Sequence, residues 1–233
     1  MKYRLFTFIF GIVLFVSCSD MFDNVKPYEG DIVYPAKFDT IYGFIGYERV
    51  EIDLLKAGRL PANEIKMGKA KKTVIQYDQE KIVIDSLCSW VNIKNIPLPK
   101  LYRFRIYTID EFENQSVPQV IALIPYTAED KDLLEVPIPR FDYSESGATI
   151  SWPAGISSVM LHFCGLTYSY IDKDGVLKTG DTKDTRPVIP VENLEPGVNY
   201  IVDIDYKVVP VLNETTPILD TVEIARPLTV RMP

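Results

Sequence analysis

The chain has 233 residues, of which 47% are hydrophobic and 24% charged. This is the composition of a protein that folds around an apolar core, and it excludes wholesale disorder, a collagen-like chain and a protein with many membrane spans. Lys and Arg number 25 against 32 Asp and Glu, which gives a net charge of -7. Because phosphate binding needs a surplus of cations, this balance argues against nucleic acid as the main partner. The chain has a single histidine, His162, which leaves little basis for His-based metal sites.

Residues 1–17 have the pattern of a signal peptide. Basic residues near the start precede the uncharged run Leu5–Val16, which is too short for a membrane-spanning helix of about 20 residues. Cys18 follows after a small residue, and this order resembles a bacterial lipobox, in which the cysteine is acylated and becomes the mature N-terminus. Phe15 stands where leucine is usual. The alternative is an ordinary signal peptide with an incidental cysteine, but the charged start and the polar residues after Cys18 favour lipidation.

Residues 18–30 then predict a polar tether between the acylated cysteine and the folded chain. Asp20 and Asp23 lie just after the cysteine and resemble surface-export signals of Bacteroidetes lipoproteins. Acyl chains hold a protein on a membrane without spanning it. We therefore expect a lipid-anchored outer-membrane protein whose partner is the membrane itself, displayed on the cell surface or, alternatively, on the periplasmic face.

Beyond residue 30, apolar and polar residues alternate in short runs separated by Pro, Gly, Asn and Asp, which is typical of an all-β sandwich or barrel. An internal repeat supports this interpretation. A shift of 98 residues superposes Val91 on Ile189, Ile93 on Val191, Asn95 on Asn193, Ile96 on Leu194 and Tyr102 on Tyr200. The sequence thus predicts one β unit present twice.

The second copy resembles an immunoglobulin or fibronectin type III module. Leu194–Tyr200 matches the L-x-P-G-x-x-Y corner of these modules, in which a tyrosine hydroxyl bonds to upstream backbone while its ring enters the core. Ala148–Trp152 resembles the second strand with its core tryptophan. After the corner, Tyr200 and every second residue up to Val208 should face the core. The residues between them should face solvent.

The first copy matches less closely. Its corner, Ile96–Tyr102, lacks the glycine, but Tyr102–Tyr126 resembles the closing hairpin of the same module. A short charged linker follows at 127–132. We therefore expect an all-β chain of two tandem fibronectin type III-like sandwiches over residues 31–127 and 128–233, each close to the size of a stable sandwich.

Two further segments, Asp31–Lys37 as an entry and Gly46–Val50 as a strand, combine with the lipobox and the tandem modules into a wider resemblance. The chain is similar to a Bacteroidetes surface lipoprotein family with a domain of unknown function. The resemblance implies an outer-membrane or surface location and frequent association with glycan-uptake loci. It supplies no catalytic or binding residues.

Few residues suggest catalysis. His162 and Cys164 share a strand face two residues apart, where side chains point the same way without meeting, so a partly buried structural histidine is the favoured interpretation. Cys88 and Cys164 have apolar neighbours and are expected to be small buried thiols. Asp203 and Asp205 could form a paired-carboxylate site for glycoside hydrolysis, but they fall in the outward register of a sandwich strand. We expect a solvated face there and no enzyme.

Two charged clusters also have plain structural explanations. The acidic group of Asp172, Asp174, Asp181 and Asp184 suggests calcium, but Gly175 follows Asp174 at once, which indicates a hairpin turn rather than a calcium loop. We expect no metal and no cofactor.

A basic run comprises Lys66, Lys69, Lys71 and Lys72. It predicts a solvated edge strand, on which lysine discourages sheet-to-sheet aggregation. Contact with anionic lipopolysaccharide or an acidic glycan is the alternative.

Trp90 and Asn92 are the candidate ligand-binding residues. The repeat places Val91 and Ile93 inward, so Trp90 and Asn92 should point outward, where an indole can stack on a sugar ring and an amide can bind its hydroxyls. The alternative is that Trp90 packs against a loop or the other module. The sequence as a whole predicts a non-enzymatic envelope lipoprotein that binds glycan or acts as a scaffold beside outer-membrane polysaccharide-uptake proteins. The alternative is a spacer or adhesin that binds a protein and has no small ligand.

Overall fold

The computed structural model describes residues 34–56 and 58–233. The predicted signal peptide 1–17, Cys18 and the tether 18–30 lie outside these residues, as does the start of the predicted entry segment. Among the described residues, no helix is both long and apolar enough to cross a bilayer.

The first half of the described chain forms two antiparallel sheets, here called the first module. Their order is β1-β2-β5 and β4-β3-β6-β7. The strands are β1 (Tyr42–Gly46), β2 (Arg49–Asp53), β3 (Lys72–Tyr77), β4 (Glu80–Ile84), β5 (Trp90–Lys94), β6 (Tyr102–Ile109) and β7 (Gln119–Leu123), with a 3-10 turn, η2, at Ala62–Glu64. Buried side chains from both sheets, such as Ile52 and Phe104, meet in one core.

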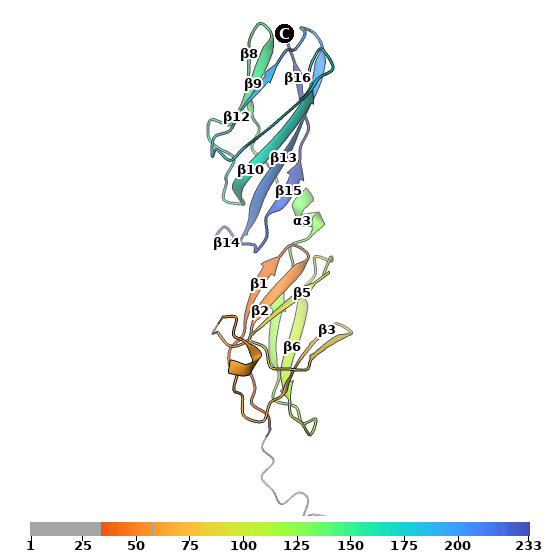
Figure 1. Cartoon of the computed structure of the whole chain (residues 1–233), viewed down its shortest axis with the longest axis vertical. Coiled ribbons are helices and arrows are strands. Elements are labelled where there is room, and N and C mark those ends of the chain that lie inside the picture. The colour runs from red at the N-terminus through yellow and green to blue at the C-terminus, as the bar shows by residue number, and fades with distance from the viewer. Residues whose placement is uncertain (1–33, 57) are drawn as a thin grey trace, which may run out of the picture.

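The second module follows the short helix α3 (Ala128–Asp132) and has the same arrangement (Figure 1). One sheet has the order β12-β9-β8, and the other is built on β11-β10-β13, with β14, β15 and β16 also pairing with β13. The strands are β8 (Arg140–Tyr143), β9 (Gly147–Ser151), β10 (Leu161–Ile171), β11 (Leu177–Thr182), β12 (Val188–Glu192), β13 (Asn199–Leu212), β14 (Thr216–Pro217), β15 (Val222–Ala225) and β16 (Leu228–Arg231). The chain is therefore all-β, as predicted, with tandem fibronectin type III-like sandwiches.

The repeat appears in backbone detail. Asn95 and Asn193 directly follow the equivalent strands β5 and β12, and both adopt left-handed conformations with φ of 62° and 60°. Asparagine tolerates this region better than most residues. The next residue in each copy donates its N–H to the turn of the preceding hairpin, Ile96 to Glu48 and Leu194 to Ser146, both at 2.9 Å. The residues superposed by the 98-residue shift thus occupy equivalent places.

The second module confirms the predicted corner and core. Trp152 is 2% exposed, and its indole N–H donates to the Pro137 carbonyl at 2.9 Å. The hydroxyl of Tyr200 accepts a hydrogen bond from the Glu195 N–H at 3.0 Å. Along β13, buried and exposed residues alternate from Tyr200 to Val208 as expected.

The prediction of one strand over Gly46–Val50 is wrong, because the segment spans the β1-β2 hairpin: Gly46 ends β1, Tyr47 and Glu48 form the turn, and Arg49 and Val50 begin β2. Glu48 has a φ of 51°, and the turn is held by contacts from elsewhere in the chain. The Glu48 N–H donates to the Tyr126 carbonyl at 2.7 Å, and the Tyr47 N–H donates to Asp220 at 2.7 Å. These distant partners satisfy the turn backbone, and nothing in the local sequence reveals them.

The basic run is not an edge strand. Its last member, Lys72, begins β3, which lies inside its sheet between β4 and β6. Lys66, Lys69 and Lys71 are exposed in the segment before that strand. The prediction failed because β4, formed by Glu80–Ile84, covers the side of β3 that we expected to be open.

The segment predicted as a charged linker contains helix α3. The backbone N–H and the hydroxyl of Thr127 both donate to the Asp130 carboxylate, at 2.8 and 2.9 Å. Such a carboxylate at the first turn satisfies groups that the helix leaves unpaired and interacts favourably with its positive end.

Candidate functional site

The outer face of the β1-β2-β5 sheet, here called the aromatic face, gathers three aromatic side chains. Tyr42 and Phe44 on β1 are 40% and 38% exposed, and Trp90 on β5 is half-buried. The rings of Phe44 and Trp90 stack with centroids 5.2 Å apart and planes 19° apart. The guanidinium of Arg59 lies 5.2 Å from the centroid of the Trp90 ring. Phe44 and Arg59 therefore both contact the Trp90 ring.

A buried carboxylate, Glu51 on β2, holds the aromatic face together. It accepts hydrogen bonds from the Trp90 indole at 2.6 Å, from Arg59 at 2.9 Å and from Asn92 at 3.3 Å, and it is paired with Arg49. Burial alone would raise the pKa of Glu51, but the hydrogen bonds from Arg49, Trp90 and Arg59 outweigh it and lower the pKa. The carboxylate is therefore ionised near neutral pH and fixes the positions of its four partners.

A hollow of about 370 Å³ lies beside the indole. Its lining combines an aromatic ring, a guanidinium, an amide and hydroxyls, contributed by Arg59, Leu60, Ala62, Ser86, Leu87, Cys88, Ser89, Trp90 and Asn92. Donors beside an apolar ring suit a ligand that itself has an apolar face and polar edges.

The two predicted ligand-binding residues are thus brought together. Val91 and Ile93 are buried, Asn92 is exposed, and Trp90 points outward from the sheet as the alternation requires. Trp90 is nevertheless packed against Phe44 and bonded to Glu51, so it is not a free platform. Tyr42 and Phe44 are the more exposed aromatic rings of this face.

Arg49 links the aromatic face to the second module. Its guanidinium donates a hydrogen bond to Glu51. It also donates to both carboxylate oxygens of Asp220, at 2.8 and 2.9 Å. The Ile45 carbonyl also accepts the Leu219 N–H at 2.8 Å. Gly46 makes room for this contact, since a Cβ there would lie 2.5 Å from an Asp220 oxygen. The hydrogen bond to Asp220 raises the pKa of Arg49, so the guanidinium remains charged.

The residues considered for catalysis do not form a site. His162 is exposed rather than partly buried, because its neighbour Leu161 takes the core side of β10. Cys164 is exposed as well, and the prediction of a buried thiol is wrong there. The register of β10 against β13 shifts between Phe163 and Gly165, so Cys164 is the extra residue of a β-bulge and is left without a cross-strand partner. Cys88 is half-buried, and burial raises the pKa of its thiol.

Asp203 and Asp205 are exposed on the outer face of β13, in the register that the alternation predicts. Asp172, by contrast, is 5% exposed and serves the β10-β11 turn. Its carboxylate accepts bonds from the Asn193 amide at 3.0 Å and from backbone N–H groups of the turn, and these bonds lower the pKa of Asp172. Within residues 34–56 and 58–233, no group of three or more His, Cys, Asp and Glu side chains is placed to hold a metal ion.

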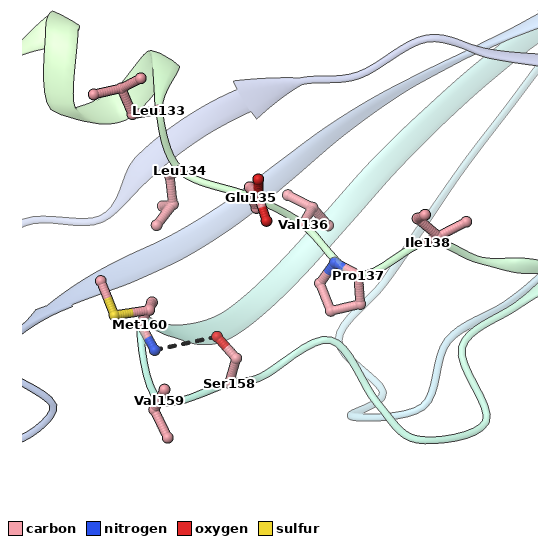
Figure 2. Close-up of a pocket in the computed structure, with 9 residues that line it drawn as sticks. All are labelled: Leu133, Leu134, Glu135, Val136, Pro137, Ile138, Ser158, Val159 and Met160. Carbon is pink, nitrogen blue, oxygen red and sulfur yellow. Dashed lines mark hydrogen bonds between the residues drawn. The ribbon is translucent and has the colours of Figure 1, made fainter.

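An apolar groove lies on the second module next to α3 (Figure 2). It has a volume of about 550 Å³ and runs between the linker to β8 and the segment before β10. Its walls are Leu133, Leu134, Glu135, Val136, Pro137, Ile138, Ser158, Val159 and Met160. Ile138 is 92% exposed and Leu133 81% exposed. Side chains of this kind, gathered on one surface, are typical of a contact site.

The aromatic face is organised by Arg49, Glu51 and Asp220, and none of these was predicted from the sequence. No signal within the sequence could have paired Arg49 with Asp220, because 171 positions separate them. Glu51 could have been noticed, since it stands between Val50 and Ile52 in outward register beside the strand that carries Trp90.

A family model, DUF4998, described as a domain of unknown function, matches residues 18–210. The chain belongs to this family. DUF4998 covers the whole aromatic face but ends before Asp220, the second-module partner of Arg49. No curated protein matches the chain.

Several solved structures are similar to this DUF4998 chain. The FN1–FN3 domains of chicken CNTN1 are 13% identical, with a TM-score of 0.35 over 83% of this chain and 67% of that one. A two-domain fibronectin type III segment of chicken tenascin is 14% identical, with a TM-score of 0.32 over 85% of this chain and 100% of that one. The chicken interferon gamma receptor alpha chain is 11% identical, with a TM-score of 0.30 over 87% and 100%. These likenesses concern the fold alone.

Proposed function

We propose that this protein is a non-enzymatic lipoprotein of the bacterial cell envelope that binds a polysaccharide through the aromatic face, as an accessory of outer-membrane uptake proteins. The observation that carries the proposal is that exposed Tyr42 and Phe44 share one sheet face with Trp90 and Asn92, which line the adjoining hollow. A sugar ring has an apolar face and a polar edge, which matches this combination of aromatic and amide groups.

The geometry supports weak, extended binding rather than a deep single-sugar pocket. Tyr42 and Phe44 stand on one strand with one residue between them, so they lie about 7 Å apart and offer neighbouring contacts along a chain of sugars. Several such contacts together are needed for useful affinity.

A location on the outer membrane is supported by the lipobox-like pattern ending at Cys18 and by the resemblance to surface lipoproteins. The 13-residue tether over 18–30 would carry the first module, and with it the aromatic face, away from the lipid surface. Replacing Cys18 with Ser should release the protein from membranes into the soluble fraction. Unchanged membrane retention of Cys18→Ser would contradict acylation as the anchor.

Binding is tested by retardation in native gels that contain one polysaccharide each, across a broad panel. We expect saturable retardation of the wild type on at least one polysaccharide, and its loss in Phe44→Ala and Trp90→Ala. Phe112→Ala is the matched control, because Phe112 is 71% exposed in the β6-β7 loop, away from the aromatic face.

If no polysaccharide retards the wild type, glycan binding is refuted and the role of spacer or protein-binding adhesin replaces it. Equal loss in Phe112→Ala and Phe44→Ala would also contradict a specific site. Circular dichroism of each variant separates loss of binding from loss of fold.

A further inference from the structure

The charges of the aromatic face are divided by sign between buried and exposed positions. Glu51 and Asp53 on β2 are 5% and 8% exposed. Lys56 and Arg59, which follow that strand, and Lys94 on β5 are all exposed. The acids therefore lie beneath the face, and the cations are the charges that a ligand on this face would meet.

Both acids are already bonded inside the protein. Glu51 accepts hydrogen bonds from four side chains, two of which are the cations Arg49 and Arg59. The Asp53 carboxylate accepts the backbone N–H groups of Leu55 and Lys56, at 3.0 and 2.9 Å, and so holds the turn after β2. Neither carboxylate faces an approaching ligand, so neither opposes an anionic one at close range.

Two cations lie against the aromatic rings at one end of the face. The ammonium group of Lys56 lies 5.7 Å from the centroid of the Tyr42 ring, and the Arg59 guanidinium lies 5.2 Å from that of Trp90. The Arg59 side chain is 70% exposed and uses one of its amino groups for Glu51, which leaves further N–H donors for a ligand. Among the described residues that line the hollow, Arg59 is the only charged one.

Lys94 places a third cation at the other end of the face. It follows Trp90 and Asn92 in the outward register of β5, about 13 Å along the strand from Trp90. At that end, Arg49 already donates to both carboxylate oxygens of Asp220, so Lys94 supplies the exposed charge. Cations thus stand at both ends of the surface that carries the aromatic rings and the amide.

This surface differs in sign from the chain as a whole. The net charge of the protein is -7, and the outer face of β13 in the second module carries the exposed acids Asp203 and Asp205. Net charge would therefore repel a polyanion, and attraction has to come from a local group of cations. Such a local match of sign favours one class of partner and disfavours others.

We propose that the polysaccharide bound at the aromatic face is anionic and carries carboxylate or sulfate groups on its sugar rings. This inference rests on the proposed function and names the class of its ligand. The rings of Tyr42 and Phe44 contact the apolar faces of the sugars, and the Asn92 amide binds their hydroxyls. Lys56 and Arg59 bind the acidic groups. A planar guanidinium matches the paired oxygens of such groups, which assigns to Arg59 the acidic group that enters the hollow.

The test compares polysaccharides that share a backbone and differ in charge. Polygalacturonate has free carboxylates and its full methyl ester has none, and dextran sulfate and dextran differ in sulfate in the same way. In native gels, we expect at least one charged polymer to retard the wild type at about a tenfold lower concentration than its neutral counterpart, the effect of two exposed ion pairs. Added salt should reduce this difference by screening. The pair with the larger difference distinguishes carboxylate from sulfate.

Single variants locate the attraction. Lys56→Gln should weaken binding of the charged polymer about two- to fivefold, the contribution of one exposed ion pair, and leave binding of the neutral polymer unchanged. Lys56→Arg keeps the charge and should keep the affinity. Lys81→Gln is the matched control, because it removes the same charge from an exposed position on β4 in the other sheet of the module.

The outcomes separate this inference from the proposed function. If each neutral polymer retards the wild type as strongly as its charged counterpart, the face still binds polysaccharide and the inference is refuted. An equal loss in Lys81→Gln and Lys56→Gln would also overturn it, because the attraction would then belong to the whole surface. If no polymer, charged or neutral, retards the wild type, the proposed function fails and the inference fails with it.

Discussion

The two modules use their tryptophans in opposite ways. Trp152 in the second module lies in the core, 2% exposed, with its ring at right angles to that of Tyr206. Trp90 in the first module stands on the outside of a sheet, stacked on Phe44 and bonded to a buried carboxylate. Tryptophan thus packs in the core of the second module and lies on the outer sheet face of the first. The candidate binding face belongs to the first module, whose tryptophan is not part of the core.

The corners that precede β6 and β13 also differ between the two modules. Tyr200 is held by a hydrogen bond from Glu195 in a corner that contains Gly197 with a φ of 79°. Tyr102 is equally buried, but in the described part of the chain no hydrogen bond to its hydroxyl is found, and its corner has no glycine. The corner of the second module is therefore closer to the fibronectin type III pattern than that of the first.

The largest effect we expect is the loss of stability on replacing the two tryptophans with alanine. Trp152→Ala removes a fully buried ring and should lower the free energy of unfolding by about 3–5 kcal/mol. Trp90→Ala removes a half-buried ring and one hydrogen bond to Glu51, and should cost about 1–3 kcal/mol. Urea unfolding followed by circular dichroism measures both. Equal losses for the two variants would contradict the opposite roles of these tryptophans.

Local periodicity predicted the parts of the fold that depend on neighbours in sequence. The alternation from Tyr200 to Val208, the core position of Trp152 and the equivalence of Asn95 and Asn193 all follow from strand geometry. These features are fixed by residues within a few positions of one another.

Features fixed by distant contacts were not predictable in this way. The turn at Tyr47 and Glu48 depends on contacts from Tyr126 and Asp220, and the register shift at Cys164 depends on the pairing of β10 with β13. On the aromatic face, the sequence identified Trp90 and Asn92, whereas the buried carboxylate beneath them depends on pairing between strands β2 and β5, which are separated by two other strands. Long-range pairing leaves no short-range pattern.

An intermediate effect is expected at the contact between the modules. Asp220→Asn keeps the shape of the side chain but removes the charge that Arg49 and the Tyr47 N–H bind. Hydrogen bonds to charged groups contribute about 1.5–3 kcal/mol, so we expect a loss of about that size. Small-angle scattering should also show a wider range of module orientations. Exposed Asp203→Asn is the control, and a similar loss there would contradict a specific role for Asp220.

The same contact predicts a pH dependence. Burial works to raise the pKa of Asp220, but hydrogen bonds from Arg49 and the Tyr47 N–H outweigh it and lower the pKa below its usual value of 3.8. A carboxyl group with a lowered folded pKa contributes stability above its unfolded pKa and loses it as the pH falls through the folded pKa. The melting temperature of the wild type should therefore fall below about pH 4, and this fall should be smaller in Asp220→Asn. An identical pH dependence of the melting temperature in the two proteins would contradict a stabilising role for the Arg49–Asp220 ion pair.

The smallest effect should distinguish the two corners directly. Tyr200→Phe removes a hydroxyl that accepts the Glu195 N–H and should cost about 1 kcal/mol, the net contribution of one hydrogen bond. Tyr102→Phe leaves the ring in the core and removes a hydroxyl with no such partner, so its free energy of unfolding should change by less than about 0.5 kcal/mol. Paired urea titrations of the two variants measure this difference. A larger loss for Tyr102→Phe than for Tyr200→Phe would mean that the first module, and not the second, keeps the hydrogen-bonded corner of the fold.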